Sequence, residues 1–221
     1  MDKTDIAVAV FNKLAKEYQD KFMDVNLYGD TFDFFCNELS NENARVLDIA
    51  CGPGNITKYL LNKRADLQIM GIDLAPNMIE LAGINNPTAT FQVMDCRNIG
   101  TMTEEFEGIM CGFCLPYLPK DETEKLIMNA ASLLHDGGLI YLSTMEDDYS
   151  NSTFKKGSKG DEIFMHFYLA ADLEQMLSKN NFKIIKLDRK DYPSPDGTKT
   201  IDLVIIAQKQ AIGNNLSQTT L

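Results

Sequence analysis

The most constraining feature of this 221-residue sequence is an acidic residue placed between a short apolar run and a glycine-rich turn. Residues 45–49 have the composition of a buried parallel strand and carry Asp48. The turn contains Gly52 and Gly54, and a helical stripe follows at Ile56, Tyr59 and Leu60. A strand, a glycine turn and a helix in this order let the backbone approach a ligand at a helix N-terminus. Asp48 would repel a phosphate there but would attract an ammonium or sulfonium group.

Two further acids end apolar runs in the same way. Asp73 ends residues 68–73, and Asp95 stands near the end of residues 91–96. Because the carboxyl ends of parallel strands meet at one edge of a sheet, Asp73 can accept both ribose hydroxyls of an adenosine. The short polar side chain of Asp95 suits the exocyclic amine of adenine. The alternative interpretation is three solvated turn aspartates, although three such acids in register are hard to obtain by chance.

These residues carry a resemblance. The stretch Asp48-x-Ala50-x-Gly52-x-Gly54 is similar to motif I of the class I methyltransferases that use S-adenosylmethionine (AdoMet), although Ala50 replaces the usual glycine. Asp73 and Asp95 match the acids that follow in that family. A nicotinamide fingerprint would want glycine where Thr57 stands. The resemblance implies AdoMet as the cofactor, S-adenosylhomocysteine as the product, no metal, and a cofactor site formed by Tyr18, Asp48, Ala50, Cys51, Gly52, Gly54, Asp73, Leu74, Met78, Asp95, Cys96, Cys111 and Phe113.

The resemblance extends over residues 44–145 and implies the fold. Strands are expected at 106–113 and 139–144, and Asp121 with Glu124 resembles a capping box at the start of the helix between them. The residues His135 to Gly138 are expected to end that helix. Two more β runs, 182–187 and 201–207, flank a turn signal at 193–197. We therefore expect a Rossmann-like α/β fold whose seven-stranded sheet has the order 3-2-1-4-5-7-6, with strand 7 antiparallel and helices on both faces.

The flanks should form the rest of one domain over residues 1–210. Residues 1–42 are expected to be a helical cap, 43–145 the AdoMet-binding core, 146–210 a substrate-side insertion with the last strands, and 211–221 a disordered tail. A stripe in the cap predicts one amphipathic helix through Ile6, Val10, Leu14, Tyr18 and Phe22. Tyr18 resembles an aromatic residue that the family places near the methionine, but a stripe that only covers the sheet explains it equally well. A second helix near Asp30 should bury Phe32, Phe35 and Leu39.

Charge and composition bear on the partners. The net charge is −11, and only Lys155, Lys156 and Lys159 cluster, so the basic footprint of a nucleic-acid reader is missing. No membrane-spanning run and no signal peptide are evident, which favours a cytoplasmic protein. We expect a monomer or a homodimer. The expected walls of the acceptor pocket are apolar and favour a small-molecule acceptor: Tyr18, Phe113, Tyr117, Tyr149, Phe164 and Phe167. The polar stretch 150–160 is expected to be a loop on the substrate side.

Two residue types could supply extra chemistry. The five cysteines form no even framework, and Cys111 and Cys114 have the spacing of a redox or zinc pair without a second pair. We expect both to line the exit of the fourth strand against the methionine portion of the cofactor. His166 lies in an aromatic segment and is a candidate general base for the acceptor, although a lone histidine among apolar residues is more often structural.

The sequence leaves three other functions open. A protein of this class could bind AdoMet without catalysis, methylate a nucleic acid or protein, or, if Thr57 tolerates a pyrophosphate, bind a nicotinamide cofactor. Transfer of a methyl group from a sulfonium is an in-line displacement that depends mainly on positioning. The residues therefore identify the cofactor better than the acceptor atom, which can be oxygen, nitrogen, carbon or sulfur.

Overall fold

A seven-stranded mixed sheet organises the protein. The computed structural model describes residues 2–157, 159–193 and 199–211. The strands of this sheet are β1 (Arg45–Ile49), β2 (Gln68–Asp73), β3 (Thr90–Val93), β4 (Phe106–Gly112), β5 (Leu134–Met145), β8 (Phe182–Pro193) and β9 (Lys199–Lys209). Their spatial order is β3-β2-β1-β4-β5-β9-β8, and β9 runs antiparallel to both of its neighbours. Because β8 and β9 are the sixth and seventh strands of this sheet, the expected order and the antiparallel strand are confirmed.

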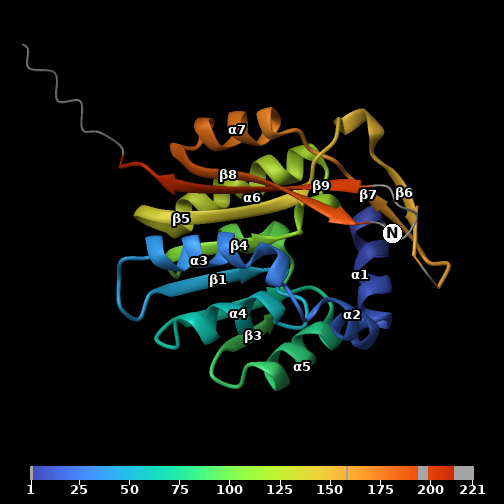
Figure 1. The fold of residues 1–221 in the computed structure, drawn as a ribbon, viewed down its shortest axis with the longest axis horizontal. Coiled ribbons are helices and arrows are strands. Elements are labelled where there is room, and N and C mark those ends of the chain that lie inside the picture. The colour runs from blue at the N-terminus through green and yellow to red at the C-terminus, as the bar shows by residue number, and fades with distance from the viewer. Residues whose placement is uncertain (1, 158, 194–198, 212–221) are drawn as a thin grey trace, which may run out of the picture.

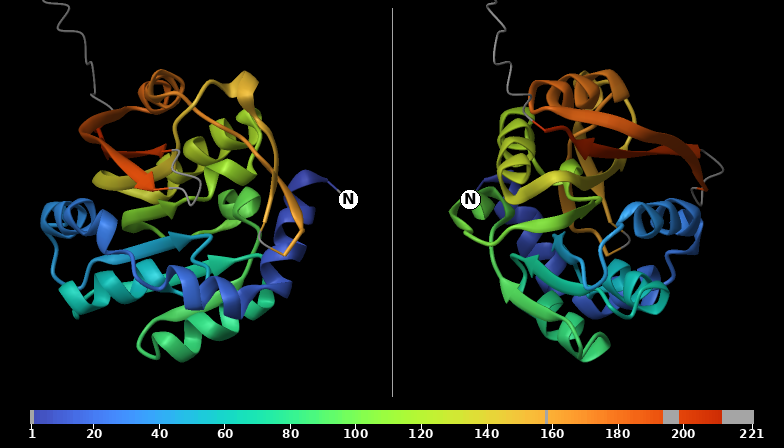
Figure 2. Two further views of the ribbon diagram at one scale, coloured as in Figure 1. Left: turned by 45° about the vertical axis from the view of Figure 1, so that its right-hand side comes forward. Right: turned by 90° about the vertical axis from the view of Figure 1, so that its left-hand side faces the viewer.

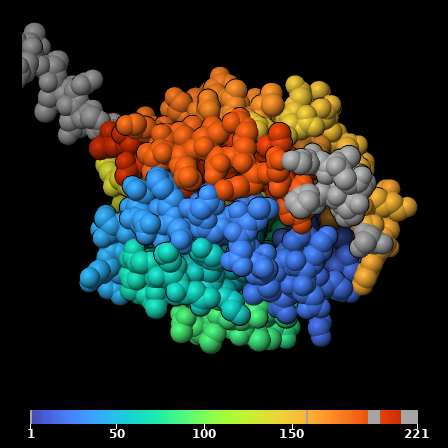
Figure 3. Space-filling model, viewed as in Figure 1, coloured from blue at the N-terminus to red at the C-terminus, as the bar shows by residue number. Residues whose placement is uncertain are grey.

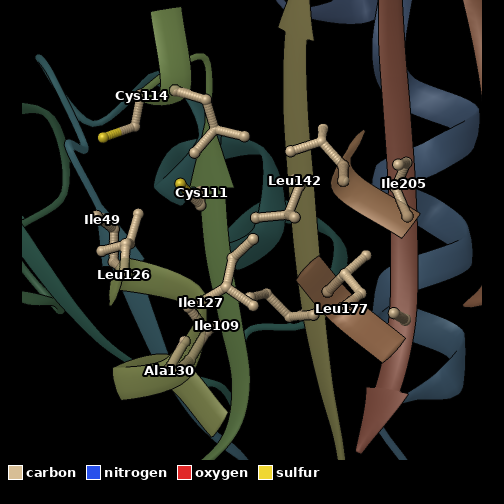
Figure 4. Packing of buried hydrophobic residues seen from close by; sticks show 14 of the residues in the cluster. Ile49, Ile109, Cys111, Cys114, Leu126, Ile127, Ala130, Leu142, Leu177 and Ile205 are labelled. Carbon is tan, nitrogen blue, oxygen red and sulfur yellow. The ribbon is translucent and has the colours of Figure 1, made fainter. Parts of the chain in front are cut away.

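Helices cover both faces of the sheet because successive strand residues point to opposite sides (Figure 1). On one face α3 (Gly29–Glu38) and α4 (Asn55–Lys63) pack over residues such as Val46. On the other face α6 (Lys120–Leu133) and α7 (Ala170–Lys179) pack over Leu47 and Ile49. Figure 4 shows this second layer, where side chains of α6 and α7 meet those of β1, β4, β5 and β9. β1 is buried against both layers.

The N-terminal cap consists of two helices where the sequence predicted one. α1 (Lys3–Lys13) and α2 (Ala15–Phe22) are separated at Leu14, whose backbone (φ −106°, ψ 21°) leaves the helical conformation. This break lets the chain bend around the strand ends, and it changes which residues of α1 face inward. The next helix, α3, follows a 3₁₀ turn (η1, Asn26–Tyr28), and Phe32, Phe35 and Leu39 are buried as expected.

The segment predicted as a loop over residues 150–160 instead contains the first strand of a β-hairpin. β6 (Thr153–Lys156) pairs antiparallel with β7 (Glu162–Met165). Phe154 and Phe164 lie opposite each other with their ring centroids 5.1 Å apart, and such cross-strand aromatic pairs stabilise hairpins. The serine, glycine and lysine residues concealed this alternation. The hairpin lies against α1 at the end of the sheet where the parallel strands finish (Figure 2).

The helix α6 begins and ends differently from the prediction. Its N-cap is Pro119, and no side chain caps it, so the capping box of Asp121 and Glu124 is wrong. At the other end Leu134 is already extended and starts β5, so the helix ends before the glycines expected to cap it. The ring of Pro119 favours the extended backbone (φ −69°, ψ 166°) that precedes the helix.

The remaining elements complete the chain. α5 (Pro76–Asn85) starts at a proline, and three further 3₁₀ turns are η2 (Cys96–Thr101), η3 (Leu115–Tyr117) and η4 (Tyr149–Asn151). Most of the predicted turn at 193–197 and nearly all of the predicted tail at 211–221 lie outside the described residues. Across the described ranges, none of the helices is both long and apolar enough to cross a membrane.

Gly54, at the N-cap of α4, packs against the C-terminal end of α5. Its φ of 76° is a left-handed conformation that costs other residues free energy. A Cβ atom there would lie 2.3 Å from the Nδ2 atom of Asn86 and 3.3 Å from Ala82. The same Asn86 amide donates a hydrogen bond to the Gly54 carbonyl at 3.0 Å. Helix packing and the left-handed backbone therefore already require glycine at this position.

We expect Gly54→Ala to lower the free energy of unfolding by at least about 1–2 kcal/mol, because the new side chain is strained and displaces Asn86. The matched control is Gly83→Ala inside α5, where a Cβ meets nothing within 4 Å. That control should be neutral or stabilising by about 0.5–1 kcal/mol. Urea titrations of both variants measure the difference, and equal stabilities would refute the packing role.

Candidate functional site

A cavity lies at the carboxyl ends of β1, β2, β3 and β4, beneath the N-terminal cap. The strand ends contribute Ala50, Gly52, Asp73, Leu74, Ala75, Met78, Met94, Asp95, Cys96, Gly112, Phe113, Cys114, Tyr117 and Leu118. The cap contributes Thr4, Ala7, Val8, Phe11 and Tyr18. In the space-filling view the cap helices lie against α4 and α5 (Figure 3). This edge of a parallel sheet is where open α/β folds bind their ligands.

Asp73 is held in place by the turn that follows β1. One carboxylate oxygen accepts a hydrogen bond from the Gly52 N–H at 2.9 Å, and the other accepts one from the Ala75 N–H at 2.8 Å. Burial raises the pKa of Asp73, while these backbone hydrogen bonds act in the opposite direction. The carboxylate therefore joins the ends of β1 and β2 and presents its remaining acceptor positions to the cavity.

Asp48 lies behind the turn and is 1% exposed. One of its oxygens accepts a hydrogen bond from the Thr57 hydroxyl at 2.6 Å, whereas Oδ1 is buried and has no partner. Burial raises the pKa of Asp48 to about 7. The hydrogen bond from Thr57 acts to lower this pKa, and the charge of Asp73 acts to raise it further. A buried carboxyl group with one free oxygen favours a positively charged ligand nearby.

Asp95 reaches the cavity from the exit of β3 and is tied to Arg97. The guanidinium Nη2 of Arg97 lies 2.7 Å from its carboxylate, and the Arg97 backbone N–H donates to it at 2.8 Å. Arg97 also pairs with Asp2 at 2.9 Å, at the N-cap of α1. The acid expected beside adenine is therefore already ion-paired, and its partner connects it to the cap.

Two residues at the centre of the cavity wall adopt a strained backbone. Ala50 has φ 53° and Phe113 has φ 55°, both in the region that L-residues with a side chain rarely adopt. The Phe113 N–H donates a hydrogen bond to the Ser143 hydroxyl oxygen at 3.0 Å, which holds the chain at the end of β4. Strain of this kind gathers at functional sites. Gly52, with φ 54°, faces Tyr18, whose ring would lie 3.7 Å from an added Cβ.

The structure brings nine of the thirteen predicted cofactor residues to the cavity wall: Tyr18, Ala50, Gly52, Asp73, Leu74, Met78, Asp95, Cys96 and Phe113. Asp48, Cys51, Gly54 and Cys111 are not on the wall. Cys111 differs most from its expectation, because alternation along β4 turns its side chain into the core between Ile49 and Ile127 (Figure 4). Cys114, two residues beyond the strand, takes the wall position.

His166 does not reach the cavity. Its ring stacks on Tyr149 with centroids 5.6 Å apart and meets Phe164 at 4.9 Å. Its Nδ1 atom is buried without a partner, and burial lowers the pKa of the imidazole. Three of the expected pocket walls, Tyr149, Phe164 and Phe167, belong to this region and are likewise absent from the cavity wall. The geometry therefore gives His166 no contact with a ligand in this cavity.

Sequence reasoning missed the contribution of α1. Thr4, Ala7, Val8 and Phe11 line the cavity, with the spacing i, i+3, i+4, i+7 that marks one helix face. The predicted stripe through Ile6 and Val10 lies on another face. The inward pattern contains a threonine and an alanine, so its hydrophobicity is low, but its spacing could have revealed it.

Comparison with known proteins agrees with this architecture. Residues 46–138 match the family described as the methyltransferase domain. A ubiquinone biosynthesis O-methyltransferase of Xanthomonas campestris is 29% identical over 118 residues, which cover 51% of this chain and 48% of that one. The chain thus spans about half the length of that curated relative.

Solved structures share the fold. The magnesium protoporphyrin IX methyltransferase of Synechocystis, solved with S-adenosylhomocysteine, superposes with a TM-score of 0.71 at 18% identity, covering 95% of this chain and 100% of that one. The 1,6-didemethyltoxoflavin N1-methyltransferase of Burkholderia thailandensis gives a TM-score of 0.68 at 20% identity, covering 93% and 88%. The sheet order is that of the Rossmann-like fold shared with these solved structures. Over residues 46–138 the chain is similar to the methyltransferase family, whose class I members use AdoMet.

The cavity fits the cofactor of that family. Asp48 lies behind the cavity wall, and its charge would favour from there the ammonium and sulfonium groups that AdoMet carries. Leu74 and Met78 offer an apolar surface for an adenine ring, and Asp73 offers acceptors for a ribose. Among the described residues, no group of three or more histidine, cysteine or acidic side chains could hold a metal ion.

The raised pKa of Asp48 predicts how cofactor affinity depends on pH. At pH 6 most of this carboxyl group is protonated, and ionisation through its pKa of about 7 creates the charge that attracts an ammonium. We expect S-adenosylhomocysteine affinity to rise by up to about tenfold between roughly pH 6 and 7.5, below the range where the α-amino group loses its proton. Calorimetry measures this, and Asp48→Asn should flatten the curve. Equal pH profiles in the two proteins would refute the role of Asp48.

Proposed function

We propose that this protein transfers the methyl group of AdoMet to a small-molecule acceptor and releases S-adenosylhomocysteine. The observation that carries the proposal is the cavity wall, which is mainly aromatic and aliphatic with Asp73 and Asp95 as its acids. Such a wall suits a small organic molecule. The names of the relatives above, which describe methyltransferases of ubiquinone biosynthesis, a porphyrin and a toxoflavin precursor, support the same class of acceptor.

The chain's own residues would act by positioning and by excluding water. AdoMet supplies a methyl group already activated by the sulfonium. Asp73, fixed by two backbone N–H groups, would orient the ribose, while Asp48 would favour the amino acid end. Tyr18 stands on the wall near Gly52, and Phe113 lies on the same wall; both would hold the acceptor in line. Alignment of two reactants can contribute about 7–11 kcal/mol, so no acid–base group is required by this geometry.

The position of Thr57 disfavours the alternative that the protein binds a nicotinamide cofactor. Its hydroxyl is committed to Asp48 at 2.6 Å, and both residues are buried directly behind the glycine turn. A pyrophosphate at this turn would lie close to a carboxyl group and would lack the third glycine of the nicotinamide fingerprint.

The proposal is tested by incubating the purified chain with AdoMet labelled in the methyl group and a panel of phenols, amines, thiols and carboxylic acids. We expect label in one class of acceptor and release of S-adenosylhomocysteine. A protein that binds AdoMet in calorimetry but labels nothing would support the non-catalytic alternative instead. Gain of label by tRNA, DNA or a protein substrate would contradict the small-molecule acceptor.

Asp73→Ala should weaken AdoMet binding by about 1.5–3 kcal/mol, the range for hydrogen bonds to a charged group. The matched control is Asp20→Ala, which removes an exposed acid from α2 away from the cavity wall. Calorimetry on the two folded variants gives the comparison. If Asp73→Ala binds as tightly as the control, Asp73 does not hold the ribose.

We also expect negligible affinity for RNA or DNA at physiological salt. The net charge of −11 repels phosphate polymers at long range. Of the three clustered lysines, Lys159 is paired with Glu17, and the ammonium of Lys155 lies 5.7 Å from the Phe167 ring. Fluorescence anisotropy with tRNA and duplex DNA checks this. Salt-sensitive micromolar binding that disappears when the three lysines are replaced would overturn it.

A further inference from the structure

Two cysteines meet on the wall of the cavity. The Sγ atoms of Cys96 and Cys114 lie 3.7 Å apart, within hydrogen-bonding distance for thiols. Cys96 begins η2 after β3, whereas Cys114 follows β4, so residues eighteen positions apart in sequence come into contact. Both side chains line the cavity. The methyl transfer proposed above makes no chemical use of either thiol.

The other three cysteines are placed differently. Cys36 is a buried residue of α3, Cys51 is buried next to Gly52 in the turn, and Cys111 is 1% exposed in the core. None of these three lines the cavity. The pKa of Cys114 is raised well above its usual value by Cys111 and by burial, while the hydrogen bond with Cys96 acts in the opposite direction. Figure 4 shows Cys111 among the aliphatic side chains and Cys114 beyond the end of β4. Cys96 is the only cysteine with intermediate exposure.

We propose that Cys96 and Cys114 form a reversible disulfide that closes the cavity to AdoMet, an inference that rests on the proposed function for its consequence but not for its chemistry. The oxidant is a peroxide. The thiolate of Cys96, the more exposed of the two, attacks a peroxide oxygen and becomes a sulfenic acid while hydroxide leaves. The Cys114 sulfur then attacks the Cys96 sulfur, and water leaves as the S–S bond forms. For hydrogen peroxide, two thiols are oxidised and one peroxide is reduced to two waters.

The distance between the sulfurs favours this reaction. A disulfide requires about 2.05 Å between the sulfurs, so the two atoms must approach further from a separation that is already van der Waals contact. The bond would join η2, which follows the adenine-side acid Asp95, to the segment that follows Phe113. Drawing these two parts of the wall together changes the space that both ends of the cofactor would occupy.

The rate of this oxidation should depend on pH. The hydrogen bond to Cys114 and burial raise the pKa of Cys96 well above its usual value, and the thiolate is the reacting form. The titratable groups that act on the two thiols are Asp95, Arg97, Cys111 and Asp73. Below the thiol pKa the thiolate fraction, and with it the rate, should rise about tenfold per pH unit.

The experiment treats the full reduced chain with hydrogen peroxide and reads the product by intact mass and peptide mapping. We expect a mass lower by two hydrogen atoms, one crosslinked peptide pair containing Cys96 and Cys114, and reversal by dithiothreitol. Cys96→Ser should lose the crosslink, whereas Cys36→Ser should retain it. A crosslink through Cys111, or oxidation to sulfinic acid without any crosslink, would overturn the assignment even if a variant fails to fold, because wild-type mapping decides it.

The link to the cofactor is measured separately. Reduced and oxidised wild type are titrated with S-adenosylhomocysteine, and the oxidised form should bind at least about tenfold more weakly, with binding restored by dithiothreitol. Bound S-adenosylhomocysteine should in turn slow crosslinking, because coupling between the two events is reciprocal. Equal affinities of the two forms would overturn the closing of the cavity. Reduced protein that binds no S-adenosylhomocysteine would instead refute the proposed function, while the disulfide assignment would stand on its mass data.

Discussion

The hydrogen bond from Thr57 to Asp48 connects the strand, the turn and the helix on which the site depends. It joins β1 to α4 behind the glycine-rich turn, at 2.6 Å and in full burial. Within the turn, the Gly52 N–H donates a hydrogen bond to Asp73, and this bond fixes the end of β2. Burying a carboxyl group with one unpaired oxygen costs stability. That cost is the expected signature of a cavity prepared for a charged ligand.

The sheet and the central residues of the site could be predicted from the sequence because both follow from chain-local patterns. Each strand-end acid stands at or near the end of a short apolar run in the sequence. Parallel strands bring their carboxyl ends to the same edge of the sheet. The order of the seven strands follows from the same resemblance. Gly54 shows the limit of this reasoning. The motif predicts this glycine next to the cofactor, whereas in the structure it packs between α4 and α5.

The features that could not be predicted depend on which face of a helix or strand points toward the cavity or the core. The break at Leu14 sets the orientation of α1, and it has no proline or glycine to announce it. Strand alternation turns Cys111 into the core and leaves the wall to Cys114. The contact between Cys96 and Cys114 arises only when the exits of β3 and β4 come together. Residues 150–160 hid a hairpin because cross-strand pairing, not composition, stabilises it.

The hairpin is fastened to the cap by ion pairs at its tip. Lys13 binds Asp161 at 2.9 Å, and Lys159 binds Glu17; three of these side chains are at least half exposed, and Asp161 is 21% exposed. Exposed pairs of this kind contribute about 0–1 kcal/mol each and weaken as salt rises. We therefore expect the attachment of the cap helices to the hairpin to weaken as the ionic strength rises.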